Sequence, residues 1–433
     1  MAKIKVNRKA NRILKTYLAL TLLSTFASSF IWGINTLFLL DADLSITQAF
    51  AANAFFTAGQ VLFEVPTGIA ADTLGRRASY LLGSATLFVA TILYLLLWQT
   101  HGPFWAWAVI SMLLGLGFTF FSGATEAWLV DGMNAAKYKG TLETVLAKGA
   151  IASGVAMLTG TVAGGVIAQF SNLGVPYILR AAMLLLTFII AFAFMRDEGF
   201  SPRKSASLLR ETRSVLKASL KYGIRNPPVR WLMLSAPFAG GVSMFAFYAM
   251  QPYLLELYGG PESYAIAGIA AAIVAGAQII GGLLVPFAGK LFHRRTTLLL
   301  VGSALSAVVL GLMGFVAIFW VVLILLSMWS IVFAATGPIR QAFINGLIPS
   351  EQRATVLSSD NLLSSFGGVV FQPGLGKVAE AWGYPASYVA SAAIQFMALP
   401  FILFAMRAKA PSDAIKPQTK TGATLKTVSG KQK

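Results

Sequence analysis

The sequence predicts an all-α integral membrane protein with twelve transmembrane helices. Of its 433 residues, 57% are hydrophobic and only 12% are charged, whereas a soluble domain carries about 25% charged residues. Apolar runs of the length that crosses a bilayer, about 20 residues, recur along the whole chain. A transmembrane β-barrel is disfavoured because no segment alternates in hydrophobicity for long.

The predicted spans are bounded by charged residues, by glycine and proline, or by a fall in hydropathy. In the first half of the chain they lie at 16–40, 46–71, 78–98, 103–130, 142–170 and 176–195. In the second half they lie at 229–257, 263–289, 296–314, 316–345, 355–380 and 384–406. The apolar run after the basic N-terminal segment is too long for a cleaved signal peptide, so we expect the first span to be retained.

Basic residues divide the connections between spans into two kinds. Only the connections after even-numbered spans contain them, at Arg76, Arg77, Lys137, Lys139, 196–228, Lys290, Arg294, Arg295 and Arg353. Of 34 lysines and arginines, only Arg180 and Lys377 then lie on the outer side. Because basic loops stay in the cytoplasm, we expect a multi-pass protein of a prokaryotic plasma membrane with both termini cytoplasmic. The net charge of +18 follows from this distribution, so we expect no nucleic-acid partner.

The chain contains an internal duplication. Shifted by 218 positions, 60–82 lies over 278–300, with Gln60 on Gln278 and Arg76–Arg77 on Arg294–Arg295. Shifted by 214 positions, 122–141 lies over 336–355, with Gly123 on Gly337 and Asp131 on Asn345. Parallel six-helix repeats that bind substrate at their interface are typical of secondary transporters.

We therefore divide the chain into four parts. They are an N-terminal six-helix bundle (1–195), a cytoplasmic linker (196–228), a C-terminal six-helix bundle (229–406) and a disordered cytoplasmic tail (407–433). The spacing of leucine and valine in the linker fits an amphipathic helix on the inner leaflet, and a solvated connection fits it equally well.

The connection after the second span carries a recognisable motif. In GIAADTLGRR, residues Gly68, Asp72, Gly75, Arg76 and Arg77 match the Gly-x-x-x-Asp-x-x-Gly-Arg-Arg/Lys signature of this loop in the major facilitator superfamily, which the chain resembles over its whole length. The second half keeps only Arg294 and Arg295. The resemblance implies two six-helix bundles that alternate between outward-open and inward-open states. It also implies that Asp72 braces the start of the eleventh span and that an arginine pairs with Asp131.

A glycine stripe in the fifth span has two interpretations. Gly160, Gly164 and Gly165 resemble the antiporter signature Gly-Pro-x-x-Gly-Gly of the same superfamily, with Thr161 in place of the proline. The resemblance favours export over uptake. Close packing of helices through small residues explains the stripe as well, and we favour that interpretation.

Ionisable residues inside predicted spans are costly and usually functional, and four of those in this chain merit weighing. They are Glu64, Glu126, Arg340 and Asp360, all near the cytoplasmic ends. One hypothesis is that Glu64 or Glu126 carries the coupling proton, because a low-dielectric setting favours the neutral carboxyl. The other, which we favour, is an inner gate in which carboxylates pair with Arg340 and the loop arginines.

The predicted cavity is amphipathic and aromatic. The resemblance implies that the first, fourth, seventh and tenth spans line it, and these offer Ser28, Trp32, Asn35, Tyr248 and Gln251. Such a wall suits a lipophilic or mixed-polarity solute better than a phosphate. Packing and interfacial anchoring explain each single residue as well. The two histidines lie at the ends of connections and suggest no metal site.

These observations predict a monomeric secondary transporter without a cofactor, exporting a small lipophilic compound in exchange for protons. The alternative is uptake or facilitated diffusion of a small metabolite such as a sugar or an amino acid by the same fold. An enzyme is disfavoured because the buried ionisable residues form no nucleophile–base set. An ATP-driven pump is disfavoured because the sequence contains no Gly-x-x-x-x-Gly-Lys-Ser/Thr loop.

Overall fold

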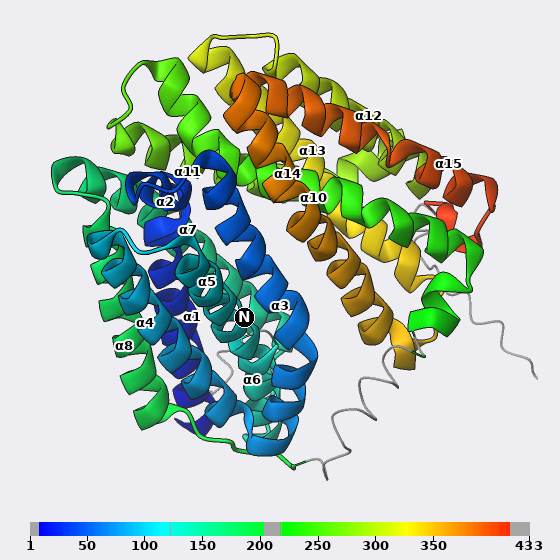
Figure 1. Cartoon of the computed structure of the whole chain (residues 1–433). Helices are drawn as coiled ribbons and strands as arrows, with labels where there is room; N and C mark the ends of the chain where they lie inside the picture. Colours follow the sequence, from blue (N-terminus) through cyan, green and yellow to red (C-terminus); the bar gives the residue numbers. More distant parts are fainter. Residues whose placement is uncertain (1–7, 122, 203–216, 218, 416–433) are drawn as a thin grey trace, which may run out of the picture.

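The computed structural model describes residues 8–121, 123–202, 217 and 219–415, and the described chain is helical apart from its connections and one isolated bridge (Figure 1). The first half contains α1 (Arg8–Trp32), α2 (Asn35–Asp41), α3 (Ile46–Leu74), α4 (Arg76–Thr100), α5 (Phe104–Phe121), α6 (Ala124–Ala135), α7 (Leu142–Phe170) and α8 (Gly174–Phe194). The second contains η1 (Ser219–Ile224), α10 (Pro227–Tyr258), α11 (Tyr264–Leu291), α12 (Arg295–Met313), α13 (Phe319–Asn345), η2 (Ser350–Gln352), α14 (Arg353–Phe396), α15 (Leu399–Arg407) and η3 (Pro411–Asp413).

These helices account for the twelve predicted spans. The first span is α1 followed by α2, and the fourth is α5 followed by α6. Ten stretches of the described chain are long and apolar enough to cross a membrane. One of them, Thr355–Arg407, includes Gly383 with a φ of 83° and non-helical backbone, and so comprises the eleventh and twelfth spans. The second span is the long helix α3, which is not among the ten.

The helices form two bundles that meet along one seam. α3 packs against α14, α7 against α11, and α2 against α10. We call the end of the bundles where the described chain begins at Arg8 and finishes at Ile415 the terminal end, and the other the distal end. Figure 1 shows α3 and α14 side by side at the distal end and clearly separated at the terminal end.

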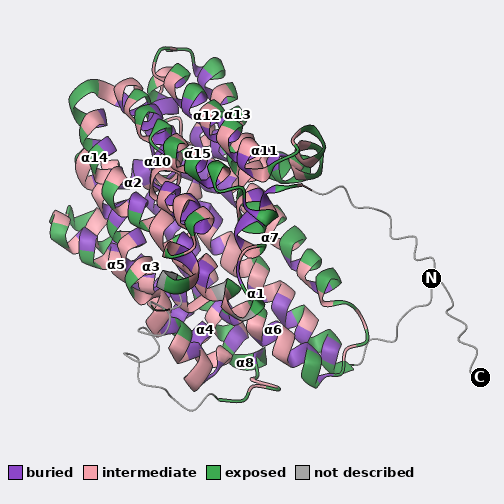
Figure 2. Ribbon diagram, turned by 90° about the vertical axis from the view of Figure 1, so that its right-hand side faces the viewer, coloured by how far each residue is buried: buried purple, intermediate pink, exposed green. Residues whose placement is uncertain are grey.

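The surface of the bundles is largely apolar, as a lipid-facing surface must be. Large hydrophobic side chains such as Phe170, Phe315 and Trp382 are between 73% and 86% exposed. Figure 2 shows exposed residues on the outward sides of the helices and buried ones between them. A contiguous apolar surface of this extent marks a membrane or interaction surface, and helices satisfy their backbone hydrogen bonds internally, as lipid requires.

Each bundle is closed at the terminal end by a segment that folds back after its last helix. After α8, the Asp197 carboxylate accepts the Arg77 backbone N–H at the start of α4 (2.9 Å). After α15, the Asp413 carboxylate accepts the Thr296 backbone N–H at the start of α12 (2.8 Å). An anion at a helix N-terminus satisfies free N–H groups and complements the helix dipole. Thus the duplication extends to both closing segments.

The second closing segment corrects the prediction of a disordered tail from residue 407. The chain packs in place as far as Ile415, whose N–H donates to the His293 carbonyl (3.0 Å), while the Ser412 hydroxyl donates to the Phe343 carbonyl (2.9 Å). Residues 416–433 lie outside the described part, as do 203–216 and 218 of the predicted linker.

Candidate functional site

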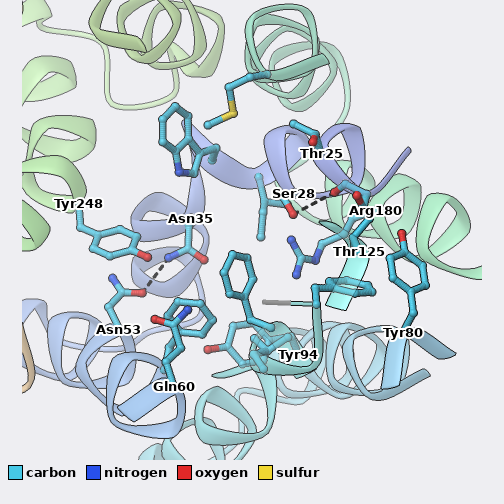
Figure 3. A pocket seen from close by; sticks show the side chains of 18 residues that line it. Thr25, Ser28, Asn35, Asn53, Gln60, Tyr80, Tyr94, Thr125, Arg180 and Tyr248 are labelled. Carbon is cyan, nitrogen blue, oxygen red and sulfur yellow. Dashed lines mark hydrogen bonds between the residues drawn. The ribbon is translucent and has the colours of Figure 1, made fainter. Parts of the chain in front are cut away.

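A cavity of about 420 Å³ lies inside the N-terminal bundle beside the seam (Figure 3). Its wall is built from helix faces with the expected spacing: Ser24, Ser28, Trp32 and Asn35 follow one face of α1 into α2. Its aromatic members are Trp32, Phe56, Tyr80, Tyr94, Phe118, Phe121 and Tyr248, and its uncharged polar ones include Thr25, Asn53, Gln60 and Thr125. A mostly apolar wall with a few polar groups is typical of a small-molecule site.

Four of the five predicted cavity residues line this cavity. They are Ser28, Trp32, Asn35 and Tyr248, and only Tyr248 comes from the C-terminal bundle. The Asn35 side-chain amide donates to the side-chain oxygen of Asn53 (2.9 Å) and accepts a hydrogen bond from the Tyr177 hydroxyl (3.0 Å). Both side-chain groups of Asn35 are therefore held by α3 and α8, which fixes the orientation of the amide at the cavity wall.

Gln251, the fifth predicted cavity residue, lies in the seam instead, where it is 1% exposed. Its amide donates to the Trp32 carbonyl (3.0 Å) and accepts the Thr36 backbone N–H (2.8 Å). These two backbone groups flank the break between α1 and α2 and have no partner within a continuous helix. Gln251 therefore bonds to backbone groups on both sides of a helix break in the other bundle. Its sequence position did not indicate this role.

Arg180 is a cavity residue that the sequence analysis placed on the outer side. It lies in α8, is 8% exposed, and points into the cavity. Its guanidinium donates to the Thr91 hydroxyl (3.2 Å) and to the Ala27 carbonyl (3.5 Å). It is the one charged side chain among the described residues of the wall. Its position inside a predicted span was the signal that could have found it.

A second residue missed by sequence reasoning joins the bundles at the distal end. The Glu380 carboxylate of α14 accepts the Ser45 hydroxyl and the Thr47 backbone N–H, both at 2.8 Å, at the N-terminus of α3. It also pairs with Lys377 (3.0 Å) on its own helix. Because the helix dipole favours an anion at this position, Glu380 stabilises the closed distal end.

The glycine stripe lets three helices approach closely. Side chains added at Gly160 and Gly164 would collide with Ser29 and the Phe30 carbonyl of α1. A Cβ at Gly165 would lie 2.5 Å from the Tyr264 carbonyl and 2.8 Å from the Gly268 Cα of α11, in the other bundle. The stripe therefore serves helix packing, and one of its members forms the seam.

The signature loop is held by carboxylates on both sides. Arg76 pairs with Asp72 (2.8 Å), and the Arg77 guanidinium donates to the Phe192 carbonyl (2.8 Å). Gly75 has a φ of 104°, and a Cβ there would collide with the Asp197 carboxylate. In the described chain the arginines thus meet Asp72 and Asp197, and not Asp131 as the resemblance implied. Gly68 lies on α3 with open space around its Cα.

Burial raises the pKa of the Asp197 carboxyl above its ordinary value, and the backbone N–H and charge of Arg77 partly offset this effect. Asp197 is half-buried beneath Gly75 and lies outside the spans. Removal of an ionised carboxylate from water favours its neutral form. In the folded protein, burial therefore shifts the equilibrium of the Asp197 carboxyl toward its protonated form.

The four predicted in-span charges do not form one cluster. Arg340 makes a bidentate pair with Asp360 (2.8 and 2.6 Å) and also donates to Ser235 and to the Leu232 carbonyl, all within the C-terminal bundle. This pair borders a separate cavity of about 270 Å³. Glu64 is half-buried on α3, and Glu126 is exposed in the first turn of α6. In this state Arg340 is therefore bound to Asp360 and does not close a gate with the glutamates.

The described residues contain no cluster of three or more histidine, cysteine, aspartate or glutamate side chains that could hold a metal ion.

Comparisons with known proteins agree with this geometry. The sequence profile of the Major Facilitator Superfamily matches residues 17–372 and, in a second match, residues 267–431. The multidrug resistance protein MdtG of Salmonella choleraesuis (strain SC-B67) is 28% identical over 303 residues, 68% of this chain. That of Salmonella heidelberg (strain SL476) is 29% identical over the same length. The chain spans 66% of the length of these relatives.

Solved structures share the fold at low identity. The crystal structure of the nucleoside transporter NupG superposes with a TM-score of 0.72 at 11% identity, covering 91% of this chain and 99% of that one. A bacterial homologue of the human lysosomal transporter Spinster, inward-facing and unoccupied, gives a TM-score of 0.70 at 14% identity, covering 94% and 99%.

Replacing Glu380 is expected to open the distal end. Glu380→Ala removes the acceptor of two hydrogen bonds to α3, worth about 1 kcal/mol at a partly exposed site, or roughly a fivefold shift toward the open state. The chain has no cysteine, so cysteines introduced at Thr100 and Glu262 carry spin labels at these two sites only. A longer distance between the labels is expected. Lys377→Ala, which leaves the contacts to α3 intact, is the control. An unchanged distance in Glu380→Ala would contradict the role of this residue.

The stability of the terminal end is expected to depend on the pH through Asp197. Because its pKa is raised on folding, the folded state binds the proton more tightly than the unfolded state. The wild type should therefore gain stability relative to Asp197→Asn as the pH falls through the raised pKa of Asp197. Above that pKa, the difference in stability between the two proteins should be constant. Thermal melting of both proteins across this range measures the difference. A relative loss of wild-type stability on acidification would show that the arginines dominate over burial.

Proposed function

Because the chain belongs to the Major Facilitator Superfamily, a family of transporters and not of enzymes, we propose that it exports a small lipophilic compound in exchange for protons by alternating access. The observation that carries this proposal is the aromatic and weakly polar cavity beside a seam that is closed at its distal end. The relatives named multidrug resistance protein support export of such compounds.

The proposed orientation places the terminal end in the cytoplasm of a prokaryotic cell. Basic connections and both ends of the described chain share this end, as positively charged cytoplasmic loops do. The structure then corresponds to the inward-open state, ready to take a compound from the cytoplasm. In the outward-open state, the contacts of Glu380, Gln251 and Gly165 across the seam would separate. Single chains suffice for this cycle, because the cavity and the seam belong to one polypeptide.

Glu64 and Glu126 are the proposed proton-binding residues. Each is close in sequence to a residue of the cavity wall: Glu64 is one helical turn after Gln60, and Glu126 follows Thr125. Both follow their wall residues toward the terminal ends of α3 and α6, which supports placing them on a proton route from that end. Arg340 and Asp360 are proposed as a fixed strut in the C-terminal bundle, since their bidentate pair is satisfied there. This modifies the gate hypothesis, which requires Arg340 to change partners.

Uptake of a polar metabolite such as a sugar or amino acid is the second candidate. The amides of Asn35, Asn53 and Gln60 on the cavity wall favour it, because amides bind hydroxyl groups in both donor and acceptor roles. A nucleoside transporter of the same fold also fits this alternative.

Transport in proteoliposomes distinguishes the two candidates. With an imposed pH gradient, we expect a lipophilic dye or drug from a compound panel to move against the proton flux and to stop when the gradient is collapsed. Sugars and amino acids serve as the matched polar arm of the panel. Movement of only the polar compounds would favour uptake, and no gradient-driven movement of any compound would count against proton-coupled export.

Neutralising the proposed proton sites should uncouple transport. In Glu64→Gln or Glu126→Gln, pH-driven export is expected to fall by about tenfold or more, while exchange of compound without a gradient continues. Glu143→Gln removes an exposed carboxylate from the same bundle and is the control. If proton-driven export survives both changes, neither glutamate carries the coupling proton.

A further inference from the structure

The cavity contains a buried cation without a counter-charge. Arg180 is 8% exposed, and none of the ion pairs among the described residues involves it. Its partners are a hydroxyl, from Thr91, and a carbonyl, from Ala27, and neither neutralises the charge. Charged side chains within membrane proteins are usually paired with one another or mark a substrate pathway. Because the partners of Arg180 are neutral, we interpret it as marking a substrate pathway.

The guanidinium has capacity for a further ligand. It carries five N–H donors, and in the described structure Nε and one terminal nitrogen donate one hydrogen bond each. The same side chain is part of the cavity wall, and Figure 3 shows it directed into the cavity space near Ser28. A guanidinium fork presents parallel donors that match a carboxylate or a similar oxyanion. The guanidinium of Arg180 is therefore held in one orientation, and some of its N–H donors are left for a ligand.

We propose that Arg180 is the anion-binding residue of the cavity, and that the transported compound is an organic monoanion with an apolar aromatic body. This inference rests on the proposed function and names its substrate class. The oxyanion accepts hydrogen bonds from the Arg180 guanidinium. The apolar body packs against the aromatic side chains of the wall, of which Trp32 and Tyr248 approach from the seam.

The low polarity of the cavity wall strengthens the preference for an anion. The cavity wall is mostly aromatic and aliphatic, and no described acidic side chain belongs to it. An anion opposite Arg180 is therefore attracted by one uncompensated positive charge in a medium of low dielectric constant. An organic cation would meet the same charge as repulsion. The cavity should thus discriminate by charge sign in addition to shape.

Equilibrium binding to the full-length protein in lipid nanodiscs tests the inference. The probes are 1-naphthoate, its neutral isostere 1-naphthamide, and 1-naphthylmethylammonium. We expect 1-naphthoate to bind the wild type about tenfold or more tightly than the amide, the value of a charged hydrogen bond, and the ammonium to bind most weakly. Arg180→Gln should abolish the difference between carboxylate and amide while the affinity for the amide is retained. Arg180→Lys, which keeps the charge, should preserve part of the difference in affinity between carboxylate and amide.

Lys148→Gln is the control, because it removes a positive charge from an exposed position of the same bundle outside the cavity wall. It should leave the preference for the carboxylate unchanged. A wild type that binds carboxylate and amide equally would overturn the inference without reference to any variant. An equal loss of both ligands in a folded Arg180→Gln would show a structural role only. The measurement uses no pH gradient, so a failure of proton-coupled export would not affect it.

Discussion

The structure depends on one steric constraint, the backbone-to-backbone contact of the two bundles at the distal end. Gly165 of α7 lies against Gly268 of α11, and Gly33, at the break after α1, lies against the same two helices. Any side chain at Gly165 would collide with main-chain atoms, which cannot move aside as a flexible side chain can. This contact holds the distal ends together, whereas Figure 1 shows the terminal ends of α3 and α14 apart.

The polar contacts of the seam follow from that approach. A helix break leaves unpaired backbone groups, which in lipid must find partners. At the break between α1 and α2, those groups are met by Gln251 from the opposite bundle, and at the start of α3 they are met by Glu380. Both partners are available only while the bundles are in contact here. Opening the distal end would therefore require water or other groups to replace them, which couples local hydrogen bonding to the global state.

Sequence reasoning could locate the spans but not the rotation of each helix about its axis. Apolar runs, basic connections and the GIAADTLGRR motif are enough to predict the twelve helices and the two bundles. Several spans are apolar all round, so periodicity does not distinguish a residue facing the cavity from one facing the seam. For this reason Gln251 is predicted in the cavity. Arg180 is counted on the outer side by its place near the start of the sixth predicted span, which says nothing about the direction of its side chain. The partner of Arg77 was missed because Asp197 lies 120 positions away in a connection.

The two bundles share the hydrogen bonds that cap their helices but differ in the charged residues of their interiors. Asp197 and Asp413 occupy equivalent positions after the last helix of each bundle and cap equivalent helices. The charged residues of the two interiors differ: Arg180 meets only neutral partners beside the cavity of the first bundle, whereas Arg340 is neutralised by Asp360 in the second. Under the proposed mechanism, equivalent scaffolds would let the bundles move as similar rigid bodies, while an uncompensated charge in one of them would make ligand binding asymmetric. A ligand held mainly by the N-terminal bundle and touched by Tyr248 from the other would then respond to the relative position of the bundles, which is what alternating access requires.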